Sequence, residues 1–317
     1  MTEFELIRTY FAAQSLARAD VRVGIGDDAA IVRAPAGMET VVTTDVLAAG
    51  VHFFSDVDPT ALGHKSLAVN LSDLAAMGAE PAWFLLNLTL PEATASWLQG
   101  FAAGMLALAR RHNVQLIGGD TSRGPLSVGI TAIGLVPEGK GLLRSGARPG
   151  DLIYVTGTLG DAALALAQRR GKRSFRADET AAIEARLDRP VPRIGEGVAL
   201  RDLASSAIDV SDGLLADLGH ILEASGVGAR LTLDAIPLSA VYRARLAEVG
   251  WDYALAGGDD YELCVTVPPK NEPAIDAAKL SLTAIGKITA EPGLEVYDGS
   301  GRRYQPTDTG YNHFKSK

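Results

Sequence analysis

The sequence predicts an α/β protein of two domains, and three observations support this fold class. Apolar runs with strand patterns alternate with amphipathic helical patterns along both halves of the chain. With 317 residues, of which 47% are hydrophobic and 21% charged, the chain is long and apolar enough for two cores. A Gly-, Pro- and Arg-rich stretch, "PEGKGLLRSGARPGD", separates two apolar strands. We therefore expect an N-terminal domain at 1–137, a linker at 138–150 and a C-terminal domain at 151–317.

The first half opens with a helical pattern in "MTEFELIRTYF", followed by a loop rich in Gly and Asp. "TVVTTD" predicts a strand that ends at Asp45. A long helix is expected from about Pro59, and Gly78 ends it. "WFLLNLTL" predicts a strand, 94–112 a helix, "VQLIGGD" a strand that ends in a turn, and "LSVGITAIGLV" a further strand.

The second half repeats this alternation. "LIYVTG" predicts a strand, and helical patterns cover roughly 160–170, 178–187 and 193–203. "AIDVS" predicts a strand, and a helix follows from Gly213. "ARLTLD" and "YELCVTV" predict two more strands, which completes a second α/β unit.

The net charge and the cysteine content limit the possible binding partners and the cellular compartment of the protein. A formal net charge of −8 argues against a nucleic acid or an anionic membrane as partner, because both attract clustered Lys and Arg. Cys264 is the lone cysteine, lies in the apolar run "ELCVTV" and reads as a core residue. No apolar run reaches the 18 residues of a membrane span, and the first residues do not resemble a signal peptide. We expect a cytoplasmic protein.

Two short motifs resemble nucleotide-binding fingerprints and are rejected. "VGIGDDAA" matches a dinucleotide-binding glycine loop, with Asp45 at the distance of its ribose-binding acid. That motif needs a long helix directly after the glycines, and Pro35 and Gly37 prevent one. "GLVPEGK" fits seven places of a Walker loop, but Gly141 stands where the magnesium-binding Ser or Thr is required.

A recurrent placement of aspartate beside Gly, Ser or Thr remains. Each one alone fits a turn or a helix cap. Many follow apolar strands, however, and strand ends converge at the sheet edge where α/β proteins bind ligands. The set comprises Asp27, Asp28, Asp45, Asp73, Asp120, Asp209, Asp212, Asp259 and Asp260.

Such a convergence requires positive charge. Two carboxylates 4 Å apart repel by roughly 4 kcal/mol at an effective dielectric near 20, and a bound polyphosphate would add to the repulsion. Lys and Arg are sparse near these motifs. Mg²⁺ binds carboxylate, hydroxyl and phosphate oxygens, so it is the expected cation, through which Asp27 and Asp28 would meet an anion. The five histidines lack paired spacing and there is no cysteine pair, so zinc is not expected.

At this point the residues resemble a known family, the thiamine-monophosphate kinases, within the superfamily typified by aminoimidazole ribonucleotide synthetase and selenophosphate synthetase. The resemblance runs nearly end to end and rests on eight motifs in order. They are "GIGDDAA", "TTDVLAAGVHF", "HKSLAVNLSDLAAMGAEP", "LIGGDTSRGPLSVGITAIG", "RSGARPGD", "IDVSDGLLADL", "GGDDYEL" and "GYNHF".

The resemblance implies transfer of the γ-phosphoryl group of ATP onto thiamine monophosphate, assisted by several Mg²⁺ ions and without a covalent enzyme intermediate. Phosphoryl transfer mainly needs positioning and neutralised charge, so no nucleophile is expected among the residues. For the fold, the resemblance implies an N-terminal mixed sheet that forms a β-barrel across a homodimer, with flanking helices, and a C-terminal α/β sandwich.

The family's functional residues carry over position by position. The implied magnesium ligands are Asp27, Thr43, Thr44, Asp45, Asp73, Asp120, Asp209 and Asp212, beside Asp28 from the charge argument. The implied ATP contacts are Gly119, Asp120, Arg144 and Ser211; a guanidinium such as that of Arg144 binds phosphate oxygens in two-pronged fashion. The implied substrate contacts are His52, Asp259 and one terminal aromatic, Tyr311 or Phe314, which would lie against the cationic rings of thiamine.

Two positions depart from the family pattern. Many relatives have Tyr near the nucleotide where this chain has Ala102 beside Phe101, so adenine stacking is not assigned. Relatives often read Gly-Gly-Glu-Asp, and the shorter Asp259 here is expected to reach its partner through water. Two alternatives stay open: another ATP-using enzyme of the superfamily, and a metal- and nucleotide-binding regulator without turnover. The N-terminal half lacks the cysteine typical of selenophosphate synthetases.

Overall fold

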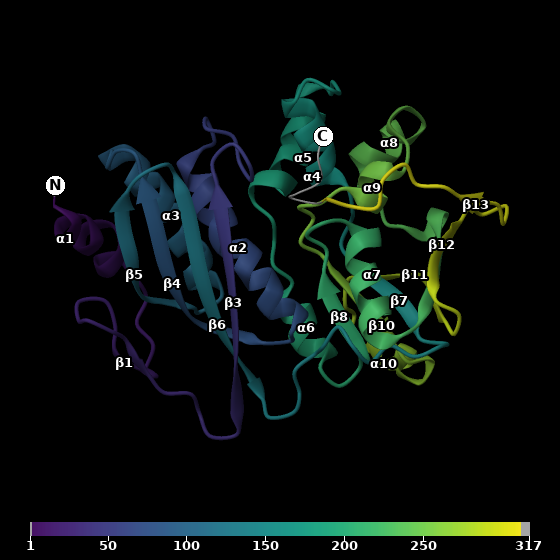
Figure 1. Ribbon diagram of the computed structural model, residues 1–317, viewed down its shortest axis with the longest axis horizontal. Helices are drawn as coiled ribbons and strands as arrows, with labels where there is room; N and C mark the ends of the chain where they lie inside the picture. Colours follow the sequence, from purple (N-terminus) through teal and green to yellow (C-terminus); the bar gives the residue numbers. More distant parts are fainter. Residues whose placement is uncertain (1, 312–317) are drawn as a thin grey trace. The chain divides into compact units, whose positions relative to one another are not determined.

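The structure is a computed structural model that describes residues 2–311 (Figure 1). The chain divides into two compact units. The first unit comprises Met1–Leu74 and Ala79–Lys140, and the second comprises Ala75–Gly78 and Gly141–Lys317. The crossing after Lys140 falls inside the expected 138–150 linker, and the short segment Ala75–Gly78 adds two earlier crossings.

The first unit is built on a mixed four-stranded sheet in the order β3-β6-β4-β5. β3, β6 and β4 pair antiparallel, and β5 runs parallel to β4. A small hairpin of β1 and β2 and a short N-terminal helix, α1, accompany the sheet. The bounds are α1 (Glu3–Leu6), β1 (Val21–Val23), β2 (Ile31–Val32), β3 (Met38–Ala48), β4 (Glu80–Leu90), β5 (Gln115–Arg123) and β6 (Ser127–Pro137).

Helices α2 (Pro59–Ala76) and α3 (Ala95–Arg111) lie against one face of this sheet (Figure 1). Their apolar side chains fill the core, and Leu67, Leu71 and Phe101 are completely buried. The other face is partly uncovered. Val42 and Val46 of β3, which project from that face, are 61% and 57% exposed.

Glycine lets the backbones of α2 and α3 touch. A Cβ added at Gly104 of α3 would lie 1.9 Å from the carbonyl oxygen of Thr60, and one at Gly63 of α2 would lie 2.0 Å from that of Phe101. Both contacts are with backbone, which has little freedom to move aside. Any side chain at either position must therefore push the two helices apart.

We expect Gly104→Ala to destabilise the first unit by about 3 kcal/mol, the upper end of the usual cost of overpacking. The matched control is Gly219→Ala in a helix of the second unit, where an added Cβ meets nothing within 4 Å. That exchange should stabilise its helix by about 0.5–1 kcal/mol, because alanine has the higher helix propensity. Calorimetric unfolding of both variants measures the effects, and equal transition temperatures would contradict the packing argument.

The second unit contains a seven-stranded sheet in the order β13-β12-β9-β11-β7-β10-β8. Its pairs are antiparallel except β12 with β9. β7 and β8 therefore end at the edge of the sheet where β10 begins. The bounds are β7 (Leu152–Thr156), β8 (Ser206–Asp209), β9 (Gly228–Thr232), β10 (Leu263–Val267), β11 (Leu282–Thr289), β12 (Gly293–Tyr297) and β13 (Arg303–Tyr304).

Helices cover both faces of this sheet. Side chains alternate along β7: Ile153 and Val155 join one core with Leu164 and Leu218, whereas Tyr154 joins a second core on the opposite face. The bounds of the helices are α4 (Asp161–Arg169), α5 (Ala177–Asp188), α6 (Ile194–Leu200), α7 (Leu214–Ser225), α8 (Ala240–Val249), α9 (Asp252–Ala256) and α10 (Glu272–Ala277).

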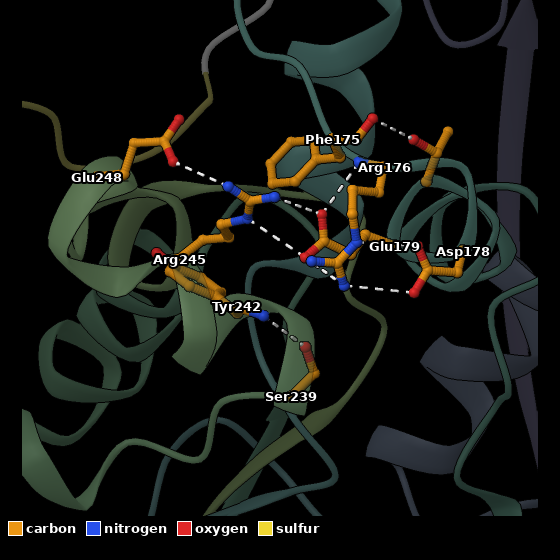
Figure 2. A network of polar contacts seen from close by, with 9 residues as sticks. Phe175, Arg176, Asp178, Glu179, Ser239, Tyr242, Arg245 and Glu248 are labelled. Atoms are coloured by element: carbon orange, nitrogen blue, oxygen red, sulfur yellow. Dashed lines mark hydrogen bonds and ion pairs between the residues drawn. The ribbon is translucent and has the colours of Figure 1, made fainter.

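A polar network joins the start of α5 to α8 (Figure 2). Glu179, whose side chain is 5% exposed, accepts from Arg245 at 2.7 Å and pairs with Arg176 at 3.2 Å. The Ser239 hydroxyl caps α8 by accepting from the Tyr242 N–H at 3.1 Å. The contact between Glu179 and Arg245 therefore links the start of α5 to α8.

The prediction of a two-domain mixed α/β fold is confirmed, and two local predictions are wrong. Asp45 and Asp120 do not end their strands, because β3 continues to Ala48 and β5 to Arg123. In the described part of the chain, no sheet closes into a barrel. No helix within residues 2–311 has the length and apolar character needed to cross a membrane.

Candidate functional site

Strand β3 and helix α2 bring three oxygen-bearing side chains of the first unit together: Thr43, Asp45 and Asp73. Thr43 and Asp45 are two residues apart on β3 and therefore project from the same face, the one that α2 covers. The Thr43 hydroxyl donates to Asp73 Oδ2 at 2.5 Å. The Asp45 N–H donates to the buried Asn70 side-chain oxygen at 3.1 Å. The helix thus fixes the strand where the carboxylates lie.

This cluster carries excess negative charge. Burial, and secondarily the charge of Asp73, raises the pKa of Asp45 to about 6. Within residues 2–311, no three acidic, histidine or cysteine side chains form a complete metal-ligand group. Mg²⁺ usually takes only one or two protein carboxylates, with substrate phosphate and water as the remaining ligands. Asp45, Asp73 and the Thr43 hydroxyl fit such a shared magnesium site.

We expect Asp45→Asn to stabilise the metal-free protein at neutral pH. Because the pKa of Asp45 is raised in the folded state, its contribution to stability is complete below about pH 4 and is lost as the pH rises through about 6. The asparagine variant should exceed wild type by about 1–3 kcal/mol at pH 7.5 in EDTA. The advantage should shrink at pH 5 and vanish near pH 3.5.

Thermal unfolding across that pH range measures the effect. Asp298→Asn is the control of opposite sign, because hydrogen bonds from the Ser300 hydroxyl and the Arg302 N–H lower the pKa of Asp298 to about 2. That variant should gain no stability at any pH. If the stability of Asp45→Asn depended on pH in the same way as that of wild type, the pKa of Asp45 would not be raised in the folded protein.

Thr44 lies apart from the cluster. As the residue between Thr43 and Asp45, it projects from the opposite face of β3. There its hydroxyl lies 3.1 Å from that of Thr131 and donates to the Ile130 carbonyl at 3.1 Å. Its predicted role as a magnesium ligand remains a prediction.

Gly119 and Asp120 lie at the far edge of the same sheet. The ladder runs from Asp45 through Ile130 and Leu86 to Gly119, and Asp120 is the next residue. Three strand spacings place the backbones of β3 and β5 roughly 14 Å apart at this level. Gly119 has φ 136°, and a Cβ there would lie 1.8 Å from the Leu86 carbonyl oxygen, so only glycine fits. The register therefore separates Asp120 from Asp45 within one chain.

Three other predicted residues occupy loops. Asp27 and Asp28 are exposed, and the Asp28 N–H donates to Asp27 Oδ1 at 2.9 Å. His52 follows the end of β3, where its Nδ1 accepts the Ala48 N–H at 3.0 Å. This contact places the proton of the neutral imidazole on Nε2, which is then a donor.

Arg144 is exposed in a loop near the start of the second unit's main segment, Gly141–Lys317. The carbonyl of Leu143, the residue before it, accepts the Ala207 N–H of β8 at 2.9 Å. The Ser225 hydroxyl, just at the end of α7, accepts the N–H groups of Gly146 and Ala147, both at 3.2 Å. Arg144 is therefore held beside β8, the strand that ends at a predicted ligand.

In the second unit, three separate segments meet beyond the end of β8. Asp209 ends that strand and is 4% exposed. The carbonyl of Ser211 accepts the Asp259 N–H at 2.8 Å, and the carbonyl of Asp212 accepts the Tyr311 N–H at 2.9 Å. These three segments carry five residues predicted to contact metal, nucleotide or substrate. Phe314 lies outside the described residues.

The loop before β10 has an unusual backbone. Asp259 and Tyr261 have φ values of 69° and 51°, a region that side chains other than glycine rarely adopt. The Tyr261 hydroxyl donates to Asp259 Oδ1 at 3.0 Å and so orients its carboxylate. Asp260 turns inward instead. It is 2% exposed, its Oδ2 accepts the Gly160 N–H at 2.7 Å, and burial raises its pKa well above the usual value.

Sequence reasoning missed Asp217, in the first turn of α7. Its Oδ2 accepts the N–H groups of Ser211, Asp212 and Gly213, each at 3.0 Å, and the residue is 3% exposed. Burial raises the pKa of Asp217 to about 7, while the N–H donors act in the opposite direction. The sequence offers no distinct signal for this role, because an aspartate near a helix start is common.

The chain matches two family descriptions. AIR synthase related protein, N-terminal domain, matches residues 26–136, and AIR synthase related protein, C-terminal domain, matches residues 148–299. Among curated proteins, the chain is 49% identical to the thiamine-monophosphate kinase of Salmonella typhimurium over 98% of both sequences.

Two solved structures resemble the protein along most of its length. The crystal structure of thiamine-monophosphate kinase from Stenotrophomonas maltophilia K279a has a TM-score of 0.86 and 45% identity, and the match covers 96% of this chain and 98% of that one. AaThiL complexed with AMPPCP and TMP has a TM-score of 0.79 and 32% identity, with 92% of each chain covered.

Proposed function

Because the chain belongs to the thiamine-monophosphate kinase family, we propose that it transfers the γ-phosphoryl group of ATP to the phosphate of thiamine monophosphate, forming thiamine diphosphate and ADP. The observation that carries this conclusion is the 49% identity to a thiamine-monophosphate kinase over 98% of both sequences. The relative complexed with AMPPCP and TMP supports binding of nucleotide and thiamine monophosphate by this chain as well.

The proposed reaction is a direct in-line transfer without a covalent enzyme intermediate. Mg²⁺ would neutralise the charge on the phosphate oxygens when bound. The residues of the chain hold and orient the reactants: the Thr43, Asp45 and Asp73 cluster offers hard oxygen ligands for the cation. Positioning and charge neutralisation are the main requirements of phosphoryl transfer, so a nucleophilic side chain is unnecessary.

The other roles in this proposal follow the resemblance. Several Mg²⁺ ions would also draw on the exposed N-terminal loop through Asp27 and Asp28, on the sheet of the first unit through Thr44 and Asp120, and on the second unit through Asp209 and Asp212. ATP would contact Gly119, Asp120, Arg144 and Ser211, with the Arg144 guanidinium on phosphate. His52, Asp259 and Tyr311 or Phe314 would contact thiamine monophosphate. The proximity of Asp259 and Tyr311 to one loop of the second unit supports a shared role.

A product assay tests the function. Purified protein is incubated with ATP, Mg²⁺ and thiamine monophosphate, and chromatography detects thiamine diphosphate and ADP in equal amounts. Tight ATP binding without product would instead indicate a regulator. ATP consumption with a different acceptor, and none with thiamine monophosphate, would indicate another enzyme of the superfamily.

Magnesium binding has a test that does not depend on turnover. Mg²⁺ should raise the unfolding temperature of wild-type protein, because a ligand that binds only the folded state stabilises it. The same addition should have a much smaller effect on Asp45→Asn. An equal rise in both proteins would remove Asp45 from the proposed ligand set.

We also propose a homodimer, in which the uncovered face of the first unit's sheet meets its twofold mate and completes a barrel. The exposed Val42 and Val46 on that face support this arrangement. Within one chain, the strand register places Asp120 far from Asp45. In the dimer, Asp120 of the second copy would take its place. Sedimentation should give the mass of a dimer, and Val46→Lys should shift it toward the monomer.

A cytoplasmic location is the final part of the proposal. Its support is the single cysteine, Cys264, which is a free and fully buried thiol. Such a residue needs no oxidising compartment. Cell fractionation tests the location, and recovery with an extracytoplasmic marker would contradict it.

A further inference from the structure

We propose that Asp217 is a positioning residue for the loop 211–213, on which a predicted magnesium ligand and a predicted nucleotide contact lie. This inference rests on the proposed function for its kinetic consequences. Asp217 itself touches neither ligand in the proposed arrangement. It acts by fixing the backbone that presents Ser211 and Asp212.

The first argument is the geometry of the loop. Three consecutive N–H groups, of Ser211, Asp212 and Gly213, converge on one oxygen of Asp217 at 3.0 Å each. Consecutive N–H groups point the same way only in a tightly curved backbone, and Gly213, with φ 121°, supplies the conformation that closes the curve. Without an acceptor at Asp217, three N–H groups in a part-buried place would lose their partner.

The second argument is the rigidity of the support. Asp217 is 3% exposed and belongs to α7, whose Leu214 and Leu218 are completely buried in the core. The loop is therefore tied to a helix that cannot shift without disturbing that core. Side chains at a functional site need such support, because displacements near 1 Å can cost about 10²-fold in rate.

The third argument is that two predicted substrate contacts, Asp259 and Tyr311, are hydrogen-bonded to this loop. While its N–H groups face Asp217, the carbonyls of Ser211 and Asp212 accept the N–H groups of Asp259 and Tyr311 at 2.8 and 2.9 Å. One carboxylate thus orders a chain of contacts through three segments. Loss of the Asp217 acceptor should disturb both the Mg·ATP contacts and the substrate contacts.

The test compares Asp217→Ala with Asp217→Asn in the full chain. Alanine removes the acceptor, whereas the asparagine carboxamide oxygen can still accept the three N–H groups. We expect alanine to raise the half-saturating Mg·ATP concentration at least about tenfold and lower kcat about 10²-fold. Asparagine should stay within about threefold of wild type. Equal impairment of both variants, or wild-type kinetics in alanine, would overturn the proposal.

Asp151→Ala is the matched control for simple loss of stability. Asp151 is also a buried aspartate of the second unit, 4% exposed, and accepts the Arg148 N–H at 3.0 Å and the Ser205 hydroxyl at 2.6 Å. It precedes β7, at the opposite edge of the sheet from the loop. This variant should lower the unfolding temperature without changing the Mg·ATP dependence. If Asp217→Ala behaved in the same way, Asp217 would be merely structural.

Hydrogen exchange separates this proposal from the proposed function. The amides of residues 211–213 should exchange slowly in wild type and in Asp217→Asn, and at least about tenfold faster in Asp217→Ala. An absence of kinase product in wild type would defeat the proposed function but leave this readout intact. Unchanged exchange in Asp217→Ala would defeat the positioning role, whatever the activity.

Discussion

Asp73→Asn is expected to lower kcat for thiamine diphosphate formation by about 10²–10³-fold, the usual cost of removing one preorganised electrostatic group. Asparagine has the same shape, and its side-chain oxygen can still accept the Thr43 hydroxyl that now lies 2.5 Å from Asp73. The fold should therefore persist. What disappears is the negative charge beside Asp45, and with it the attraction for a cation that bridges to phosphate.

Asp58→Asn is the control, because it makes the same exchange on the same helix. Asp58 caps the start of α2 by accepting the N–H groups of Thr60 and Ala61 at 3.1 and 3.2 Å. Asparagine is an equally good cap, and the site is roughly 22 Å along the helix from Asp73. This variant should keep wild-type kinetics. Wild-type turnover in Asp73→Asn, by the same chromatographic assay, would exclude the cluster of Thr43, Asp45 and Asp73 from the reaction.

Glu262→Gln should destabilise the second unit by about 3–5 kcal/mol, the range for breaking a buried ion pair from one side. The Glu262 side chain is 1% exposed, and its oxygens accept from Arg186 at 2.5 Å and from Arg193 at 2.6 Å. Thr156 is the third residue that donates to Glu262, through its hydroxyl at 2.6 Å. A neutral amide would remove this ion-pair partner from Arg186 and leave Arg193 with the longer contact to Glu196 at 3.8 Å.

The comparison for this variant is Glu295→Gln. Glu295 is 34% exposed and lies 3.4 Å from Arg230, so its exchange should change the stability far less, because solvent screens an exposed ion pair. Urea unfolding of both variants, followed by circular dichroism, measures the difference. Similar midpoints would mean that Arg186 and Arg193 find other partners when Glu262 is neutral.

Much of the fold was predictable from periodic apolar patterns. The helix expected at 94–112 is α3 at Ala95–Arg111, because its pattern is strong and its interior lacks proline. Strand ends were less predictable. β5 continues past Asp120 through Thr121, Ser122 and Arg123, polar residues that pattern reasoning assigns to a turn. They form a strand because β4 offers backbone partners, which no local signal reveals.

Some residues of the candidate site were predictable from the sequence, and others were not. Asp73 and Asp212 were identified because the resemblance to the family assigns a role to these two positions. Asp217 and Tyr261 were missed, since their roles depend on backbone curvature and left-handed φ values that follow from tertiary contacts. Asp260 looked equivalent to Asp259 in sequence, and only the turn between them sends one side chain into the core.

The segment Ala75–Gly78 limits how this protein can be divided. It belongs to the second unit, where the Arg201 side chain donates to the Gly78 carbonyl at 2.5 Å and Gly197 packs so closely that a Cβ there would lie 2.0 Å from the Ala75 oxygen. If the gene were divided at the linker, the C-terminal fragment would lack Ala75–Gly78. The N-terminal fragment would carry this segment without the residues that it packs against. The two halves are therefore not interchangeable. A chimera of two relatives should fold only when Ala75–Gly78 and the segment around Gly197 and Arg201 come from the same parent.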